Sequence, residues 1–259
     1  MNPINELEPA RKTFFEENGY LVIEDIISID ELDRYRKIYN DFLDDTIHTG
    51  KNRTDLGVGL GNNKKVENIT QIMWPSDFVP AVLNMTYHQR ALAIAKSLQG
   101  NDMEMDFDML INKAPNTGTI TPWHQDAAYW INMPDKRAVS CWLALDRATL
   151  ENGCMWYVPG SHLLPLRPHR NAGGKGSALT CNATESEGVG IELKPGSCVL
   201  HHGATLHYSR GNSSDSHRRA YIINFRPAEM IAMERAQGFD HGRTGNAAER
   251  KIRNEDFKI

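Results

Sequence analysis

The stretch Met103-Glu104-Met105-Asp106-Phe107-Asp108-Met109 alternates apolar and acidic side chains with a period of two. This period is typical of a β-strand that turns one face to a core and the other to solvent. Three carboxylates on one face are able to bind a metal ion, but a solvated or rim-exposed face is the commoner arrangement, and we expect it here. The stretch also divides the chain, because the patterns before it are mainly helical and the patterns after it are strands.

Helical patterns precede residue 103, with a short strand at 20–23 between the first two of them. The second helix is expected to begin after Ser28, with Glu31 as its capping-box partner. The expected helices cover residues 6–18, a segment from 28 to about 42, and residues 77–99, the last bent near Thr86. Residues 50–64 are rich in Gly and Asn and predict a surface loop.

Short strands separated by Gly and Pro turns follow residue 103. Besides the opening stretch, they are expected at 137–145, 155–158, 190–193, 197–201 and 219–225. Helices followed by many short strands predict a β-sandwich or barrel, mainly β with some α, covered by an N-terminal helical layer. We expect one domain over residues 1–259, with a β core at about 103–226. A tail or loosely attached helix is expected at about 228–259.

The composition is that of an ordinary globular protein. The chain has 259 residues, 40% of them hydrophobic, and a formal net charge of -4. This charge predicts neither a nucleic-acid surface nor an anionic membrane surface, and favours chemistry on a small molecule. The four cysteines form no C-x-x-C pair, the first twenty residues lack the pattern of a signal peptide, and no run of about 18 apolar residues predicts a membrane span. We therefore expect a reduced, cytoplasmic protein; the oligomeric state is not indicated.

The stretch Thr121-Pro122-Trp123-His124-Gln125-Asp126 carries the candidate chemistry. Residues i and i+2 of a strand project from the same face, so His124 and Asp126 are expected to point at one metal ion. A second histidine must come from a distant strand, and His201, His202 and His207 are available. We choose His207, because Ser209 and Arg218 follow it and together are able to hold a carboxylate.

Two histidines and one carboxylate leave three metal positions open, which is typical of non-haem Fe(II) oxygenases. A zinc site accepts the same ligands, but it does not explain Ser209 and Arg218, which we call the predicted carboxylate clamp. A Ser-His-Asp hydrolase is disfavoured, because the chain has no G-x-S-x-G sequence.

With these residues in place, the chain resembles the phytanoyl-CoA dioxygenase family of Fe(II)- and 2-oxoglutarate-dependent oxygenases from about residue 10 to 226. The matching stretches are Asn18-Gly19-Tyr20-Leu21-Val22-Ile23, Lys65-Val66-Glu67, Met109-Leu110-Ile111-Asn112-Lys113-Ala114-Pro115, Trp123-His124-Gln125-Asp126, Glu151-Asn152-Gly153-Cys154, Val158-Pro159-Gly160-Ser161-His162, and His207 through Arg218. The resemblance implies a double-stranded β-helix, or cupin-like jelly roll, in agreement with the expected strands.

The resemblance also implies roles for individual residues. His124, Asp126 and His207 correspond to the Fe(II) ligands. Arg218, assisted by Ser209, corresponds to the partner of the distal carboxylate of 2-oxoglutarate, which is consumed together with O2. The other positions that contact this co-substrate in the family correspond to Trp142, Gln125, Met109 and Lys65, the last with Lys64 beside it.

The implied activity is hydroxylation of a small organic molecule, a natural product or metabolite, with release of succinate and CO2. Asp126 favours this outcome, because related halogenases have a small residue at that position. Desaturation, cyclisation and epimerisation use the same ligands and stay open, as does a non-catalytic jelly-roll protein that binds or senses a ligand.

Two further features bear on the substrate. Tyr208 stands where relatives often have Gly, and the chain ends in Phe257-Lys258-Ile259, which is no peroxisomal address. Both observations argue against phytanoyl-CoA as the substrate. The irregular segment from Leu164 to Gly188 is a candidate lid over the site.

Overall fold

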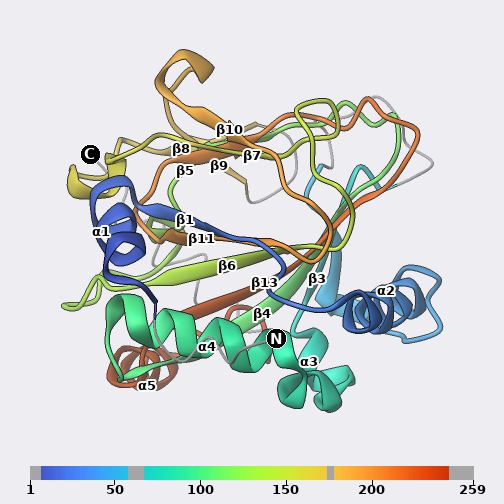
Figure 1. The fold of residues 1–259 in the computed structure, drawn as a ribbon, viewed down its shortest axis with the longest axis horizontal. Coiled ribbons are helices and arrows are strands. Elements are labelled where there is room, and N and C mark those ends of the chain that lie inside the picture. The colour runs from blue at the N-terminus through green and yellow to red at the C-terminus, as the bar shows by residue number, and fades with distance from the viewer. Residues whose placement is uncertain (1–6, 58–66, 174–177, 245–259) are drawn as a thin grey trace.

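The computed structural model describes residues 7–57, 67–173 and 178–244, which fold into two main antiparallel sheets, a small two-stranded sheet and a layer of helices (Figure 1). The strands are β1 (Tyr20–Ile23), β2 (Arg53–Asp55), β3 (Ile69–Met73), β4 (Met103–Lys113), β5 (Thr121–His124), β6 (Val139–Ala144), β7 (Met155–Tyr157), β8 (Arg170–Asn171), β9 (Leu179–Thr180), β10 (Val189–Ile191), β11 (Cys198–His202), β12 (His207–Ser209) and β13 (Arg218–Pro227). The α-helices are α1 (Pro9–Asn18), α2 (Ile29–Leu43), α3 (Pro75–Phe78), α4 (Thr86–Gln99) and α5 (Ala228–Ala236). The short 3-10 helices are η1 (Gly50–Asn52), η2 (Pro80–Asn84), η3 (Asp126–Tyr129), η4 (Ser161–Leu163) and η5 (Glu185–Glu187).

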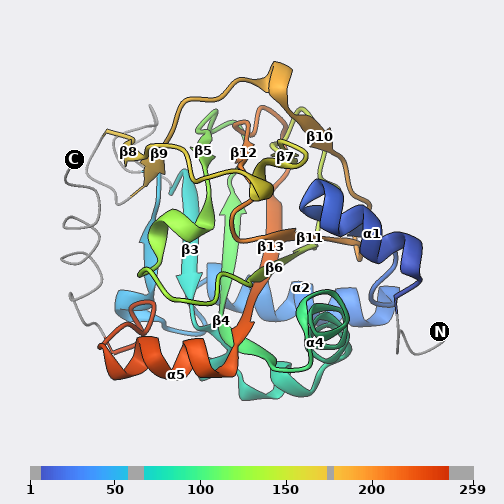
Figure 2. The ribbon, with the colours of Figure 1, turned by 90° about the vertical axis from the view of Figure 1, so that its left-hand side faces the viewer.

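The strand order is that of a jelly roll. The larger main sheet has the order β1-β11-β6-β13-β4-β3-β2, and the other main sheet has the order β10-β7-β12-β5. Strands β8 and β9 form a separate two-stranded sheet. Figure 2 shows the four-stranded sheet above the larger sheet, with α2, α4 and α5 below it. The predicted fold class, a jelly-roll core with a helical layer, is therefore confirmed, although the two sheets stay open and form no closed barrel.

The helical layer covers the outer face of the larger sheet. Its helix α2 begins with the predicted capping box, in which the Glu31 amide donates to Ser28 Oγ at 3.3 Å and the Ser28 amide donates to the Glu31 carboxylate at 3.3 Å. The predicted helix at 77–99 is interrupted, as expected, and forms α3, η2 and α4.

Alternation along β13 separates two apolar cores. Tyr221 and Ile223 belong to the cluster shared with the helices, whereas Ala220 and Ile222 belong to the cluster between the two sheets. Neighbouring residues of one strand therefore serve opposite faces. The candidate site lies on the inner face, between the sheets.

The acidic face of β4 differs from the expectation. Glu104 is exposed, but Asp106 and Asp108 are buried. The prediction of a solvated face was therefore wrong for Asp106 and Asp108. Buried partners make their burial possible: Asp108 accepts hydrogen bonds from Tyr221 Oη at 2.7 Å and Ser76 Oγ at 2.9 Å.

The second buried carboxylate belongs to a charge cluster that fastens α5 to the sheet. Asp106 pairs with Arg235 and with His241, the latter at 3.1 Å, while Arg226 pairs with buried Glu234. Asp106, Glu234 and His241 lie close enough to hold a metal ion, but the two arginines already neutralise both carboxylates. Burial alone raises the pKa of Asp106, yet the charges of His241, Arg235 and Arg226 lower it to about 2.

Other expectations need smaller corrections. The predicted loop at 50–64 contains β2, whereas residues 58–66 lie outside the described part of the chain. Strand β3 was not expected, because Ile69–Met73 is too short to show a clear period. The C-terminal segment is not loose up to residue 244, since Met230 and Phe239 are buried; residues 245–259 are not described.

Within the described residues, no helix has both the length and the apolar character needed to cross a membrane.

The charge cluster yields a prediction about stability. Replacing Arg226 with Met leaves Glu234 buried without its close partner, and we expect the free energy of unfolding to fall by about 3 to 5 kcal/mol. The matched control is Lys37→Met, which breaks the exposed pair with Asp41 and is expected to cost about 0.5 kcal/mol. Urea unfolding measures both values, and equal effects of the two variants would contradict the assignment.

Candidate active site

Three expected residues meet between the sheets. His124 ends β5, Asp126 begins η3, and His207 begins β12, directly opposite His124 in the ladder. Asp126 Oδ1 lies 3.6 Å from His124 Nε2 and 3.5 Å from His207 Nε2. One ligand atom from each residue lies within 4.8 Å of the other two, so the group is able to hold a metal ion.

Backbone carbonyls orient both imidazoles. His124 Nδ1 lies 2.7 Å from Pro122 O, and His207 Nδ1 lies 2.8 Å from Thr205 O. A carbonyl only accepts, so each Nδ1 carries the proton and each Nε2 presents a lone pair. Burial, together with the neighbouring His124, lowers the pKa of His207 well below its usual value. A neutral imidazole at pH 7 is the form that binds metals.

The carboxylate of Asp126 is held through one oxygen. Ser140 Oγ donates to Oδ2 at 2.9 Å, and His201 Nε2 lies 3.1 Å from the same oxygen. Asn224 in turn donates to Ser140 Oγ at 2.9 Å. Burial by itself raises the pKa of Asp126, but the neighbouring imidazoles of His207, His124 and His201 keep it well below its usual range. An ionised Asp126 therefore has Oδ1 directed toward the two histidines.

The sequence did not predict that Ser140, His201 and Asn224 support Asp126. Ser140 stands opposite His201 on one side and Asn224 on the other, across β11, β6 and β13. Only the strand register brings these polar residues together. A signal was present in β6, where Ser140 interrupts an otherwise apolar, fully buried strand.

A second candidate feature is the buried cation of Arg218, at the start of β13. Arg218 is 1% exposed, and its Nε and one terminal nitrogen have no hydrogen-bond partner among the described residues; the same is true of Ser209 Oγ. The guanidinium stacks over Trp142 at 5.1 Å. Burial lowers the pKa of Arg218 to about 10, so it stays charged at pH 7. Because an unpaired buried charge is costly, this arrangement fits an anionic ligand that supplies a carboxylate.

Lys113 connects Arg218 to Ser209. It stands opposite Arg218 in the β13–β4 ladder, and its Nζ donates to Ser209 O at 3.3 Å and to Thr119 O at 3.1 Å. Burial and the charge of Arg218 lower the pKa of Lys113 well below its usual value. The residues of the expected carboxylate clamp, Arg218 and Ser209, are therefore connected through one buried lysine.

The remaining expected contacts are distributed differently. Met109 lies on the inner face of β4, where its sulfur accepts from Gln71 Nε2 at 3.3 Å. The amide of Gln125 is occupied elsewhere, since Nε2 donates to Ala204 O at 2.7 Å and Oε1 accepts from Arg167 N at 2.9 Å. Lys65, like its neighbour Lys64, lies outside the described residues.

The segment from Leu164 to Gly188, apart from undescribed residues 174–177, is attached to the loop that carries Asp126. In addition to the Gln125 contact, Leu179 N donates to Tyr129 Oη at 2.7 Å, and Cys181 N donates to Trp123 O at 2.9 Å. Tyr129 meets the His124 ring edge-on at 5.6 Å between centroids. We call the described residues of the segment from Leu164 to Gly188 the cover. Trp123 stacks on Tyr208 and therefore packs next to this cover.

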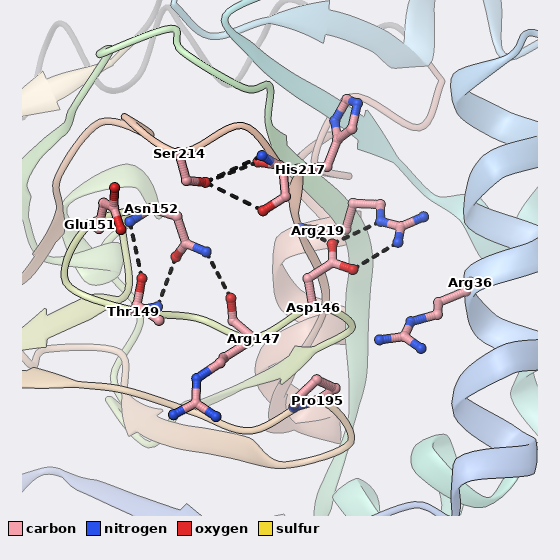
Figure 3. A pocket seen from close by; sticks show the side chains of 11 residues that line it. Arg36, Asp146, Arg147, Thr149, Glu151, Asn152, Pro195, Ser214, His217 and Arg219 are labelled. Atoms are coloured by element: carbon pink, nitrogen blue, oxygen red, sulfur yellow. Dashed lines mark hydrogen bonds and ion pairs between the residues drawn. The ribbon is translucent and has the colours of Figure 1, made fainter.

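A cavity of about 700 Å³ lies apart from these residues, among Arg36, Arg147, Pro195 and the start of β13. Figure 3 shows Arg219 there, ion-paired to Asp146. Arg219 is the only arginine adjacent to Arg218 in the chain, and its pairing at 2.7 Å leaves Arg218 as the available anchor for an anion.

Comparisons with known proteins place these residues in a family context. Residues 15–220 match the family model described as "Phytanoyl-CoA dioxygenase (PhyH)". A "Probable phytanoyl-CoA dioxygenase" of Caenorhabditis elegans is 28% identical, over 90% of this chain and 79% of that protein. A "Phytanoyl-CoA dioxygenase" of Arabidopsis thaliana is 28% identical, over 86% of this chain and 90% of that protein.

Solved structures share the fold. EvdO2 from Micromonospora carbonacea var. aurantiaca, complexed with 2-oxoglutarate, has a TM-score of 0.71 and 27% identity, covering 88% of this chain and 94% of that chain. EctD from S. alaskensis, with 2-oxoglutarate and 5-hydroxyectoine, has a TM-score of 0.70 and 23% identity, covering 88% of this chain and 79% of that chain.

The attachment of the cover predicts its sensitivity to protease. Tyr129→Phe removes the acceptor for Leu179 N, and we expect tryptic cleavage after exposed Arg170 to accelerate by roughly 2- to 10-fold, the equivalent of one hydrogen bond. Tyr35→Phe, which removes a hydroxyl bonded to His88 elsewhere, is the control. Mass spectrometry of the early fragments gives the rate, and equal rates in both variants would argue against this attachment.

Proposed function

Because the chain belongs to the phytanoyl-CoA dioxygenase family, we propose that it is an Fe(II)- and 2-oxoglutarate-dependent dioxygenase that hydroxylates a small organic molecule. The observation that carries the proposal is that the part of the chain that the structure describes contains both a His-Asp-His group and the buried guanidinium of Arg218, which has no carboxylate partner there. Neither feature alone is specific, but an anion clamp next to a three-residue metal group fits a metal-chelating dicarboxylate.

His124, Asp126 and His207 are the proposed iron ligands. Both imidazoles present Nε2, and Asp126 presents Oδ1, so the donor set is two neutral nitrogens and one anionic oxygen. Three ligands on one side of an ion leave room for other groups opposite them. Iron, with 2-oxoglutarate and O2, supplies the oxidising power for hydroxylation, with release of succinate and CO2.

Arg218 and Ser209 are the proposed clamp for the distal carboxylate of 2-oxoglutarate. The guanidinium offers two nitrogens that have no partner among residues 7–57, 67–173 and 178–244, and the hydroxyl of Ser209 offers one further donor. Trp142 stacks on the guanidinium and holds its plane, and Met109 lies on the same inner face. We leave Gln125 out of the clamp, because its amide attaches the cover instead.

The carboxylate of Asp126 supports hydroxylation over halogenation. It lies between the two histidines and occupies the place that a halide would need. The same residues are compatible with desaturation, cyclisation or epimerisation, which differ in how the substrate is held. We propose hydroxylation as the default outcome of the complete ligand set.

We also propose a reducing compartment such as the cytoplasm and no nucleic-acid partner. The four cysteines are free and buried, and the formal net charge is -4. The cover from Leu164 to Gly188 is proposed to exclude water once substrate is bound, since it is fastened to the loop of Asp126.

The iron assignment predicts a loss of metal affinity. Asp126→Ala removes the only charged donor of the group, and we expect the affinity for Fe(II) under anaerobic conditions to fall by more than about 100-fold. Asp33→Ala, an exposed position on α2, serves as the control and should bind normally. Equal Fe(II) titration curves for wild type and the Asp126 variant would remove this residue from the site.

The clamp predicts a separate effect on the co-substrate. Arg218→Met removes one partner of a desolvated charge pair, which costs about 2 to 5 kcal/mol, so the concentration of 2-oxoglutarate needed for half-saturation should rise roughly 30- to 5,000-fold. The visible charge-transfer band of the anaerobic Fe(II) complex reports this binding.

Arg219→Met is the matched control, because it changes the next residue of the same strand, on the opposite face and paired with Asp146. It should leave 2-oxoglutarate binding unchanged. If Arg219→Met weakens 2-oxoglutarate binding strongly and Arg218→Met binds it as the wild type does, the anchor is Arg219 and the assignment of Arg218 is wrong.

A further inference from the structure

A third buried histidine contacts the proposed metal group without belonging to it. His201 lies on β11 and is 3% exposed. Its Nε2 is 3.1 Å from Asp126 Oδ2, and its Nδ1 is 3.3 Å from Tyr157 Oη. Its ring centroid lies 4.5 Å from that of His207 and 5.3 Å from that of Tyr157. Both ring nitrogens therefore have a partner.

The partners determine where the protons lie. An ionised carboxylate only accepts hydrogen bonds, so Nε2 of His201 must carry a proton toward Asp126. In the neutral ring, Nδ1 then accepts, and the hydroxyl of Tyr157 donates to it. The result is a directed chain from the Tyr157 hydroxyl through His201 to Asp126 Oδ2.

We infer that His201 is a positioning residue that, together with Ser140, holds Oδ2 of Asp126 and restricts this carboxylate to a single oxygen toward the metal ion. The inference rests on the proposed iron site. Two hydrogen bonds converge on Oδ2, whereas Oδ1 lies between His124 and His207. A carboxylate held in this way cannot turn to offer both oxygens to one ion.

The restriction has a consequence for the reaction. A carboxylate bound through both oxygens occupies two coordination positions, and would leave two open positions instead of three. A co-substrate that chelates the ion, together with O2, would need all three. His201 thereby protects the space that the co-substrate requires, although it contacts neither the ion nor the co-substrate.

The test uses Co(II) alone, titrated anaerobically into wild type and variants, with its visible absorption as the readout. His201→Leu removes the donor, and we expect the Co(II) affinity to fall about 10- to 100-fold, with a shifted absorption spectrum that reports the altered coordination. His201→Gln keeps an N–H donor at similar reach, and should recover most of the affinity and the spectrum of the wild type.

A matched control separates this role from general packing. His88 is also buried and also bonded to a tyrosine hydroxyl, at 3.1 Å from Tyr35, but it contacts none of the proposed ligands. His88→Leu should lower the midpoint of thermal unfolding and leave Co(II) binding and its spectrum unchanged. If His201→Leu does not fold, Tyr157→Phe replaces it, with an expected affinity loss of roughly 2- to 10-fold.

Each outcome decides a different claim. If wild type binds no Co(II), the proposed iron site itself fails. If wild type binds and His201→Leu binds equally well with the same spectrum, the inference about His201 is overturned while the iron site stands. If His201→Gln is as weak as His201→Leu, the hydrogen bond is not the reason, and the positioning role is likewise overturned.

Discussion

The pairing of β12 with β5 is the constraint on which the candidate site depends. It places His207 opposite His124, although the two lie 83 positions apart in the chain. The same strand pairs on its other side with β7, which sets Tyr157 opposite His207. A shift of register by one residue would turn His207 to the other face of the sheet and disperse the group. The antiparallel ladder therefore brings together proposed metal ligands that no local sequence motif contains.

The buried arginines of this fold differ in whether a carboxylate pairs with them. Arg226 and Arg235 are neutralised by Glu234 and Asp106, and they fasten α5 to the sheet. Arg218 is as buried as Arg226 but has no carboxylate partner among the described residues. A fully compensated cluster stabilises structure, whereas an uncompensated cation in an interior is expected where a ligand completes it. This contrast supports the proposed co-substrate site from within the chain itself.

Several features could be predicted because their causes are local. The capping box of Ser28 and Glu31 depends on four consecutive residues, and the structure confirms it. Strand β1 follows a helix stop at Gly19, as expected. The predicted exposure of the acidic face of β4 was wrong for Asp106 and Asp108. Alternation indicates which residues share a face, but it does not indicate which other elements cover that face. Asp106 is buried by α5 and His241, which lie more than 120 residues away in the chain.

The sequence was sufficient to propose His124, Asp126, His207, Ser209 and Arg218 as site candidates, because their residue types and order are typical of a metal group followed by a carboxylate-binding pair. Folding alone decided how those residues are supported. Ser140, His201 and Asn224 meet across three strands, and Gln125 turns toward the cover. The physical reason is that hydrogen-bond partners in a sheet are determined by strand order and register, which depend on how the whole apolar core packs and which no short stretch of sequence encodes.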